Sequence, residues 1–441
     1  MPVSLHERPD MLLALPIKGE SFLFRRAGRA VLVDGGYKGD KIPDKLKRHV
    51  KDLERLDVVL CTHGDSDHAG GLPNLLDKWA GRVGQLWLPG RWVDVIPQLA
   101  RDPAGFLGEL IGELDAALEK PDEQLLRAIR DAGEESPRKG QDDIQSEPLD
   151  HDGSLFEGWD DDPDDDLGPG DPPPEPGWFE ELRIAKEQLA SDADAARAFD
   201  AARKRARYRK GRASAAPGIS IVSYWLGLIE TAEAIRGIAM AAIRHGIRTR
   251  WFDFEAFERT RRASGGARRF LVPINAVEQA PPPTSLRLYM QLTLINRQSL
   301  AFFAPPGRGR HGFLFCGDSP LGDGPGFANS FLPHLPMPFP VVIATAPHHG
   351  SESNRAAYAH LNAWAWVGVL LRAGGSMKQP GQTFLDQQDC LRLCTKCPRL
   401  KYAPMLSGVI APRPWWMLHT VGRICDCSNP TGGGAGTGDS V

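Results

Sequence analysis

The chain has 441 residues, enough for a catalytic core of about 250 residues with inserted or appended material. Hydrophobic residues (41%) and charged residues (25%) have ordinary globular frequencies, and the net charge of −3 excludes a whole-chain attraction to nucleic acid or membrane. No charged leader with a following apolar run opens the sequence, and its seven cysteines are an odd number. We therefore expect a cytoplasmic protein with reduced thiols and no membrane association.

Residues 1–96 predict alternating strands and helices. Short runs rich in Leu, Phe and Val, separated by turns, predict strands at 12–17, 21–25 and 30–34. Helical spacing and a Pro near the second helix start predict helices at 42–54 and 72–79. Apolar runs predict further strands at 56–61 and 86–88. We assign this segment to the first half of a layered α/β domain.

Residues 97–265 predict a helical insertion. Helices are expected at 106–118, 124–132, 178–206 and 220–245. The segment 134–177 is rich in Asp and Pro, which predicts a disordered acidic linker, and a basic run follows at 203–212. The apolar stretch 219–243 carries Glu230, Glu233 and Arg236, which favours a buried amphipathic helix over a membrane span.

Strands return in residues 266–375. They are expected at 269–275, 286–296, 299–303, 312–316, 341–346 and 364–371, with a helix at 353–361. Strands and helices in both halves predict a sandwich of two sheets with helices outside.

Residues 376–441 form a Cys-rich C-terminal extension. Its five thiols have a spacing close to that of a structural zinc site, although reduced and partly buried cysteines are the alternative. The candidate ligands of this extra zinc are Cys390, Cys394, Cys397, Cys425 and Cys427.

Polar side chains follow four of the predicted strands, where sheet-based enzymes place their sites. Asp34 follows the third strand, and Asp318 follows the strand at 312–316. His348 and His349 follow the strand at 341–346. The richest group follows the strand at 56–61, where two histidines and two aspartates fall within residues 63–68.

This group predicts a metal centre, because a purely structural loop would leave these side chains repelling one another and poorly satisfied. Imidazole and carboxylate ligands together bind zinc, iron or manganese. Asp318 offers a carboxylate that can bridge two ions, and His349 or His348 can complete the second site. We expect two divalent ions, zinc first and manganese as the alternative, held by His63, Asp65, Asp67, His68, Asp318 and His349.

The stretches 62–71, 313–318 and 347–351, with Asp34-Gly35-Gly36, resemble the metallo-β-lactamase superfamily, whose signature is His-x-His-x-Asp-His. With 296–300 included, they resemble more closely the soluble hydrolase domain of ComEC/Rec2-type bacterial competence proteins, where the second histidine is an aspartate, here Asp65. The resemblance implies an αββα sandwich, a dinuclear metal site and DNA degradation. No histidine fills the third motif after 86–88; His151 and His245 are poor candidates.

The resulting hypothesis is a phosphodiesterase or nuclease in which two ions activate a water as hydroxide. Asp67 would orient the nucleophile, and His348 would protonate the leaving group or contact substrate. The same site chemistry also suits acyl esters, lactones or thioesters. A third hypothesis is a binding module with a degenerate metal site, whose insertion docks a protein partner.

Overall fold

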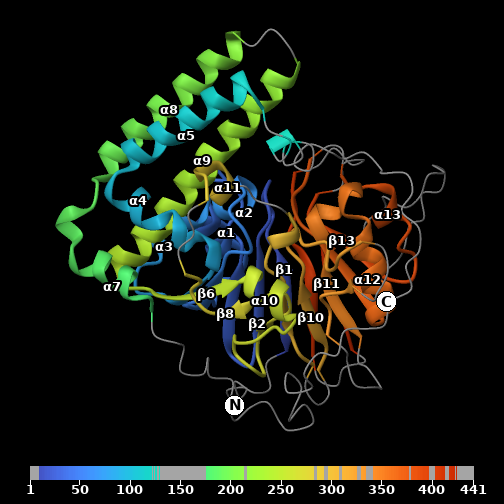
Figure 1. Cartoon of the computed structure of the whole chain (residues 1–441). Helices are drawn as coiled ribbons and strands as arrows, with labels where there is room; N and C mark the ends of the chain where they lie inside the picture. The colour runs from blue at the N-terminus through green and yellow to red at the C-terminus, as the bar shows by residue number, and fades with distance from the viewer. Residues whose placement is uncertain are drawn as a thin grey trace.

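Two β-sheets lie face to face with helices on their outer sides, and a bundle of helices projects from one side (Figure 1). The computed structural model describes residues 9–121, 123, 125–126, 129, 175–212, 216–282, 286–292, 296–306, 310–324, 329–333, 341–376, 379–396, 403–412, 417–422 and 424.

The larger sheet has nine strands in the order β15-β14-β1-β2-β3-β4-β5-β6-β8. Strands β1, β2 and β3 form an antiparallel meander, and β3 to β6 run parallel to one another. The bounds are β1 Asp10–Ala14, β2 Phe22–Arg26, β3 Arg29–Val33, β4 Leu56–Leu60, β5 Val83–Pro89, β6 Arg248–Asp253, β8 Val277–Glu278, β14 Ser407–Ala411 and β15 His419–Val421.

The smaller sheet has six strands in the order β13-β12-β11-β10-β9-β7. Strands β10 to β13 are parallel, and β9 pairs antiparallel with β10 and β7. The bounds are β7 Val272–Pro273, β9 Phe302–Ala304, β10 Gly312–Phe315, β11 Val342–Thr345, β12 Val367–Arg372 and β13 Leu391–Cys394.

Three apolar layers hold the sheets and helices together. Between the sheets, the Phe24 ring of the larger sheet lies 5.0 Å from the Phe313 ring of the smaller one. Helices α1 (Ile42–His49) and α3 (Leu72–Lys78) cover the outer face of the larger sheet. Helices α12 (Ala356–Trp364) and α13 (Gln382–Leu385) cover the smaller sheet. The predicted αββα sandwich is therefore confirmed, because each sheet buries one face on the other sheet and one face on helices.

The projecting bundle is the chain between β5 and β6. Its described helices are α4 Ile96–Arg101, α5 Pro103–Glu119, α7 Gly177–Ile184, α8 Asp192–Arg212 and α9 Ala216–His245, with short 3-10 turns η2 Gly90–Asp94 and η5 Lys186–Gln188. Helix α9 packs against α2 (Ser66–Ala69) and α3, so the bundle is anchored beside the loop after β4. No helix in the described part of the chain is long and apolar enough to cross a bilayer. Of the predicted acidic linker 134–177, only 175–177 lie among the described residues.

Strand β6 lies within the predicted insertion range of 97–265, yet it pairs with β5 in the larger sheet. Helix α10 (Phe254–Thr260) follows it. Likewise, β13, β14 and β15 fall in the predicted C-terminal extension and join the two sheets. Both segments therefore contribute strands to the sandwich itself.

The predicted strand at 286–296 is wrong. The structure has helix α11 (Leu288–Leu292) and the 3-10 turn η6 (Asn296–Gln298) in its place. The Glu113 carboxylate of α5 accepts hydrogen bonds from the backbone N–H groups of Leu288 and Tyr289, at 2.9 and 2.8 Å. This contact satisfies two N–H groups at the helix start, so tertiary structure overrides the local strand propensity. The predicted strand at 269–275 is reduced to β7.

Candidate metal centre

The loop after β4 carries four of the predicted ligands. Strand β4 is central in the larger sheet, and its carboxyl end opens into His63 and then into α2, which holds Asp67 and His68. Gly71 allows this loop to approach the loop after β3, since a Cβ there would lie 2.1 Å from the carbonyl oxygen of Gly35. Helix α3 begins directly after this glycine, at the predicted helix start beside Pro73.

Asp318, which follows β10, lies between two of these histidines. Its Oδ2 is 3.5 Å from His63 Nε2, and its Oδ1 is 3.3 Å from His68 Nε2. The side chain is buried, and its backbone N–H donates to Ser299 Oγ at 3.0 Å, which fixes the turn. Each oxygen of one carboxylate therefore faces a different imidazole, as in a carboxylate that bridges two ions.

The remaining predicted ligands lie on either side of Asp318. Asp65 Oδ2 is 3.5 Å from His63 Nε2, and its side chain is partly open to solvent. Asp67 Oδ2 is 3.0 Å from His349 Nε2. The structure thus brings all six predicted ligands together, with His63 and Asp65 on one side, Asp67 and His349 on the other, and His68 and Asp318 between them.

The ring of His68 is oriented by Asp34. Asp34 Oδ2 lies 2.8 Å from His68 Nδ1, and the carboxylate also accepts hydrogen bonds from the backbone N–H and hydroxyl of Thr62. A neutral His68 therefore holds its proton on Nδ1 and presents Nε2 to Asp318. Carboxylates that hold metal-ligating histidines in this way fix both the tautomer and the ring orientation.

His348 and His349 lie in η8 (Pro347–Gly350) with positive φ angles of 46° and 53°. The Nδ1 of His349 lies 3.0 Å from the carbonyl oxygen of Ala373, so its Nε2 faces Asp67. His348 is more exposed, and its Nε2 is 3.6 Å from Asp318 Oδ2. Left-handed backbone at two consecutive non-glycine residues is strained, and such strain concentrates at functional sites.

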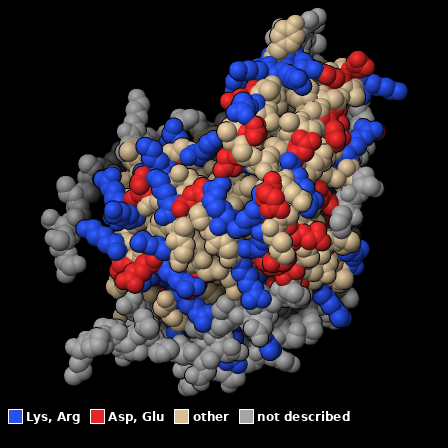
Figure 2. Space-filling view, turned by 90° about the vertical axis from the view of Figure 1, so that its left-hand side faces the viewer, with Lys and Arg blue, Asp and Glu red and all other residues tan. Residues whose placement is uncertain are grey.

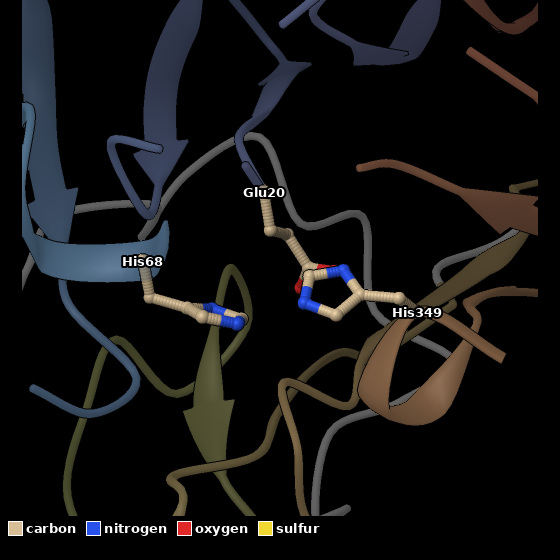
Figure 3. Close-up of side chains that lie close together, drawn as sticks. All are labelled: Glu20, His68 and His349. Atoms are coloured by element: carbon tan, nitrogen blue, oxygen red, sulfur yellow. The ribbon is translucent and has the colours of Figure 1, made fainter. Parts of the chain in front are cut away.

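Glu20, in the connection between β1 and β2, was not among the predicted ligands. Its side chain is 1% exposed, and its Oε2 lies 3.2 Å from His349 Nδ1. Figure 3 shows Glu20, His68 and His349 converging from three separate segments, and ligand atoms of the three lie within 4.8 Å of one another. In the sequence, Gly19-Glu20-Ser21 gives only the signal of a turn between strands.

Opposite charges alternate through the site. Burial and His68 lower the pKa of His63, but Asp318 and Asp65 outweigh them and raise it to about 9. Despite burial, Asp318 also raises the pKa of His68 well above its usual value. Burial opposes ionisation of Asp318, but three histidines hold its pKa well below the usual range. The metal-free site therefore holds protons that a bound cation would displace.

The donor set fits divalent ions. Among the described residues, the buried atoms without a hydrogen-bond partner include His63 Nε2, His68 Nε2, Asp318 Oδ1 and Glu20 Oε2, all within this cluster. Contacts between facing ligand atoms span 3.0 to 3.5 Å. A tetrahedral ion with bonds of 2.0–2.1 Å has ligand atoms about 3.3 Å apart. These side chains would hold one ion near His63 and a second near Asp67 and His349.

Neither His151 nor His245 is seen to supply the histidine of the third motif. His245 Nε2 is 2.8 Å from Asp77 Oδ1, in a contact between α9 and α3 away from this cluster. His151 lies outside the described residues.

Two of the five cysteines predicted to bind an extra zinc lie among the described residues. Cys394 is buried in β13, and Cys390 is partly buried; neither forms a disulfide among the described residues. Cys397, Cys425 and Cys427 lie outside the described residues, so an extra zinc stays a prediction.

An apolar pocket opens beside His63. Its wall includes Trp92 of η2, Ile235 of α9, Phe252 of β6 and Phe254 of α10. Arg91 lies in the same wall, with its guanidinium bonded to Gln298 and to the carbonyl oxygen of Met290. The lining offers apolar contacts to a small group bound next to the metal ligands.

Two arginines of the predicted basic run pair with acidic residues of neighbouring helices. Arg203 bonds to Glu233 of α9, and Arg209 bonds to Asp115 of α5. On the face shown in Figure 2, basic and acidic side chains are interspersed. Arg203 and Arg209 therefore help to hold the bundle together, and these two side chains give less support to nucleic-acid binding.

A sequence model of the metallo-beta-lactamase superfamily matches residues 16–84, which include β2, β3, β4 and the loop with His63 and His68. No curated protein matches the chain. The match, the αββα sandwich and the ligand cluster support this superfamily and, in general terms, a metal-dependent hydrolase. The match gives no support to the narrower resemblance to competence proteins.

Proposed function

We propose that the chain is a metal-dependent phosphodiesterase that acts on nucleic acid. The observation that carries this proposal is the position of Asp318, whose two oxygens face His63 and His68 at 3.5 and 3.3 Å. A carboxylate in this position suits a two-ion site. Two-ion sites suit phosphodiesters because they can act on both the attacking and the leaving oxygen of an in-line displacement.

A pair of divalent ions supplies Lewis acidity, a water of near-neutral pKa and neutralisation of phosphoryl charge. The protein's own residues would do the rest. Asp67 is held by His349 at 3.0 Å, which positions its carboxylate to orient the attacking water.

His348 is the candidate proton donor. Asn296 Nδ2 donates to His348 Nδ1 at 3.1 Å, which leaves the proton of a neutral His348 on Nε2. That Nε2 faces Asp318 from the more exposed side of the site, where a leaving group would depart. General acids of this kind contribute about 10²–10⁴-fold to rate.

The choice of nucleic acid follows the sequence resemblance to the competence hydrolases and the oxygen-rich ligand set. Carboxylate ligands at Asp65, Asp67 and Asp318 make the site tolerant of manganese as well as zinc. The helical bundle also offers a surface for a protein partner, which stays a separate hypothesis.

The apolar pocket beside His63 favours a second candidate function. An acyl ester, lactone or thioester would place its hydrocarbon part against Trp92, Phe252 and Phe254, with the scissile carbonyl at the ions. The fold does not separate acyl from phosphoryl chemistry.

The test is a hydrolysis panel with the metal-stripped full chain and added zinc, manganese or magnesium. The substrates are single- and double-stranded DNA and RNA, bis(p-nitrophenyl) phosphate, p-nitrophenyl acyl esters, a lactone, a thioester and a β-lactam. We expect metal-dependent phosphodiester cleavage that falls by about 1,000-fold in Asp67→Ala. Asp389→Ala, at an exposed position away from the cluster, is the matched control.

Cleavage of the acyl substrates alone would replace the proposal with the second candidate. Undiminished phosphodiester cleavage by Asp67→Ala would reject this site as its origin. Fewer than one tightly bound transition ion per chain would favour a binding module with a degenerate metal site.

A further inference from the structure

We propose that Glu20 is a direct ligand of the second metal ion, beside Asp67, His68 and His349. The connection between β1 and β2 would then contribute a carboxylate to the metal centre. This inference rests on the metal site of the proposed function and extends its ligand set.

Both ring nitrogens of His349 have partners other than Glu20. Its Nδ1 lies 3.0 Å from the carbonyl oxygen of Ala373, and its Nε2 lies 3.0 Å from Asp67 Oδ2. A neutral imidazole that binds an ion through Nε2 carries its proton on Nδ1. That proton has an acceptor in Ala373, so His349 can be oriented for metal binding without Glu20.

The carboxylate of Glu20 is buried beside His349. It is 1% exposed, and although Oε2 lies 3.2 Å from His349 Nδ1, this oxygen has no hydrogen-bond partner among the described residues. A buried carboxylate without a donor or cation is strongly destabilising. When His349 is neutral and metal-bound, the nearby cation that compensates Glu20 is the ion itself.

The carboxylate of Glu20 lies where it could share one ion with His68 and His349. Ligand atoms of Glu20, His68 and His349 lie within 4.8 Å of one another, and Figure 3 shows the Glu20 carboxylate behind the His349 ring, with the His68 ring pointing toward both. His63, His68 and Asp318 form the other such group, so His68 lies between the two. Three convergent nitrogen and oxygen donors from separate segments are what a divalent ion requires.

Hydrogen bonds hold the backbone of Glu20 in place. The backbone N–H of Glu20 donates to the carbonyl oxygen of Asp67 at 2.8 Å, and its carbonyl oxygen accepts from Gly36 N–H at 2.8 Å. Gly19 permits this close approach, because a Cβ there would lie 2.4 Å from the Asp67 carbonyl oxygen. The metal loop itself therefore positions the backbone of Glu20.

The test compares Glu20→Gln with wild type and with Glu54→Gln, which removes the same charge at an exposed position. Metal-stripped full-length proteins are titrated with Zn²⁺ and with Co²⁺, and affinity is measured by chelator competition. The Co²⁺ absorption spectrum and thermal unfolding with and without metal are recorded in parallel. These readouts do not depend on catalysis.

We expect Glu20→Gln to bind the second ion at least about tenfold more weakly, with an altered Co²⁺ spectrum for that ion. In the metal-free protein Glu20 pairs with His349 at 3.2 Å, so Glu20→Gln also removes that ion pair, and the metal-free variant serves as the baseline for the effect of metal. Its gain in stability on adding metal should be smaller by about 1.4 kcal/mol for each tenfold loss in affinity.

Wild-type affinity for both ions in Glu20→Gln would overturn the proposal. So would a metal-free variant that is destabilised as much as the metal-loaded one, since Glu20 would then be only a counter-ion of His349. Either result leaves the hydrolase proposal standing if wild type cleaves its substrates. Conversely, two tightly bound ions without hydrolysis would reject the function and not the ligand.

Discussion

Asp318→Asn removes the charge that the two halves of the site share while keeping the shape of the side chain. In the metal-free protein, Asp318 and Asp65 raise the pKa of His63 to about 9 from 6.5, against burial and His68. The difference corresponds to about 3 kcal/mol at roughly 1.4 kcal/mol per pKa unit. Because the folded-state pKa is raised, this stability is fully present below pH 6.5 and is lost as pH rises through 9.

The metal-free variant should therefore unfold more easily than wild type at pH 6, by up to about 3 kcal/mol, and the difference should shrink above pH 9. Urea unfolding followed by tryptophan fluorescence at pH 6 and pH 9.5 measures both values. Asp389→Asn controls for loss of one charge. An equal destabilisation at both pH values, or none at pH 6, would refute the assignment of Asp318 as the charge partner of His63.

Three further predictions concern the same centre. Metal affinity of wild type should rise between pH 6.5 and 9, because His63, with a pKa of about 9, must lose its proton to bind an ion; a flat profile in chelator competition would contradict this. Asp34→Asn should weaken metal binding roughly 10–100-fold, since the group that orients His68 loses its charge; affinity within twofold of wild type would show that this orientation has no effect. His348→Gln should lower kcat by about 100-fold or more and keep both ions bound; loss of an ion in metal analysis would make His348 a ligand in place of a proton donor.

The sequence was informative where a local pattern determines the structure. The apolar strand 56–61 and the dense His and Asp group after it identify both the strand and the edge at which it ends. The Asp318 and His349 positions follow from the same rule, because parallel strands bring their carboxyl ends to one edge. Packing of the two sheets against each other then places this edge beside the loop after β4, so the six predicted ligands are close together in the structure.

The sequence was uninformative where a distant contact decides. Glu20 reaches the centre only because its backbone bonds to Asp67, and nothing in Gly19-Glu20-Ser21 indicates more than a turn. The local sequence of residues 288–292 predicts a strand. In the structure they form a helix, whose first N–H groups donate to the carboxylate of Glu113 from another helix. Strand β14 pairs with β1 from the other end of the chain, and no local periodicity reveals this partner.

The most direct test of metal-dependent phosphodiester hydrolysis is a titration of the metal-stripped full chain with Mn²⁺ or Zn²⁺ while cleavage of bis(p-nitrophenyl) phosphate is followed. We predict no cleavage without metal and a rate that rises to a maximum at about two ions per chain. Full binding of two ions without cleavage, or cleavage that persists in the metal-stripped protein, would contradict the account.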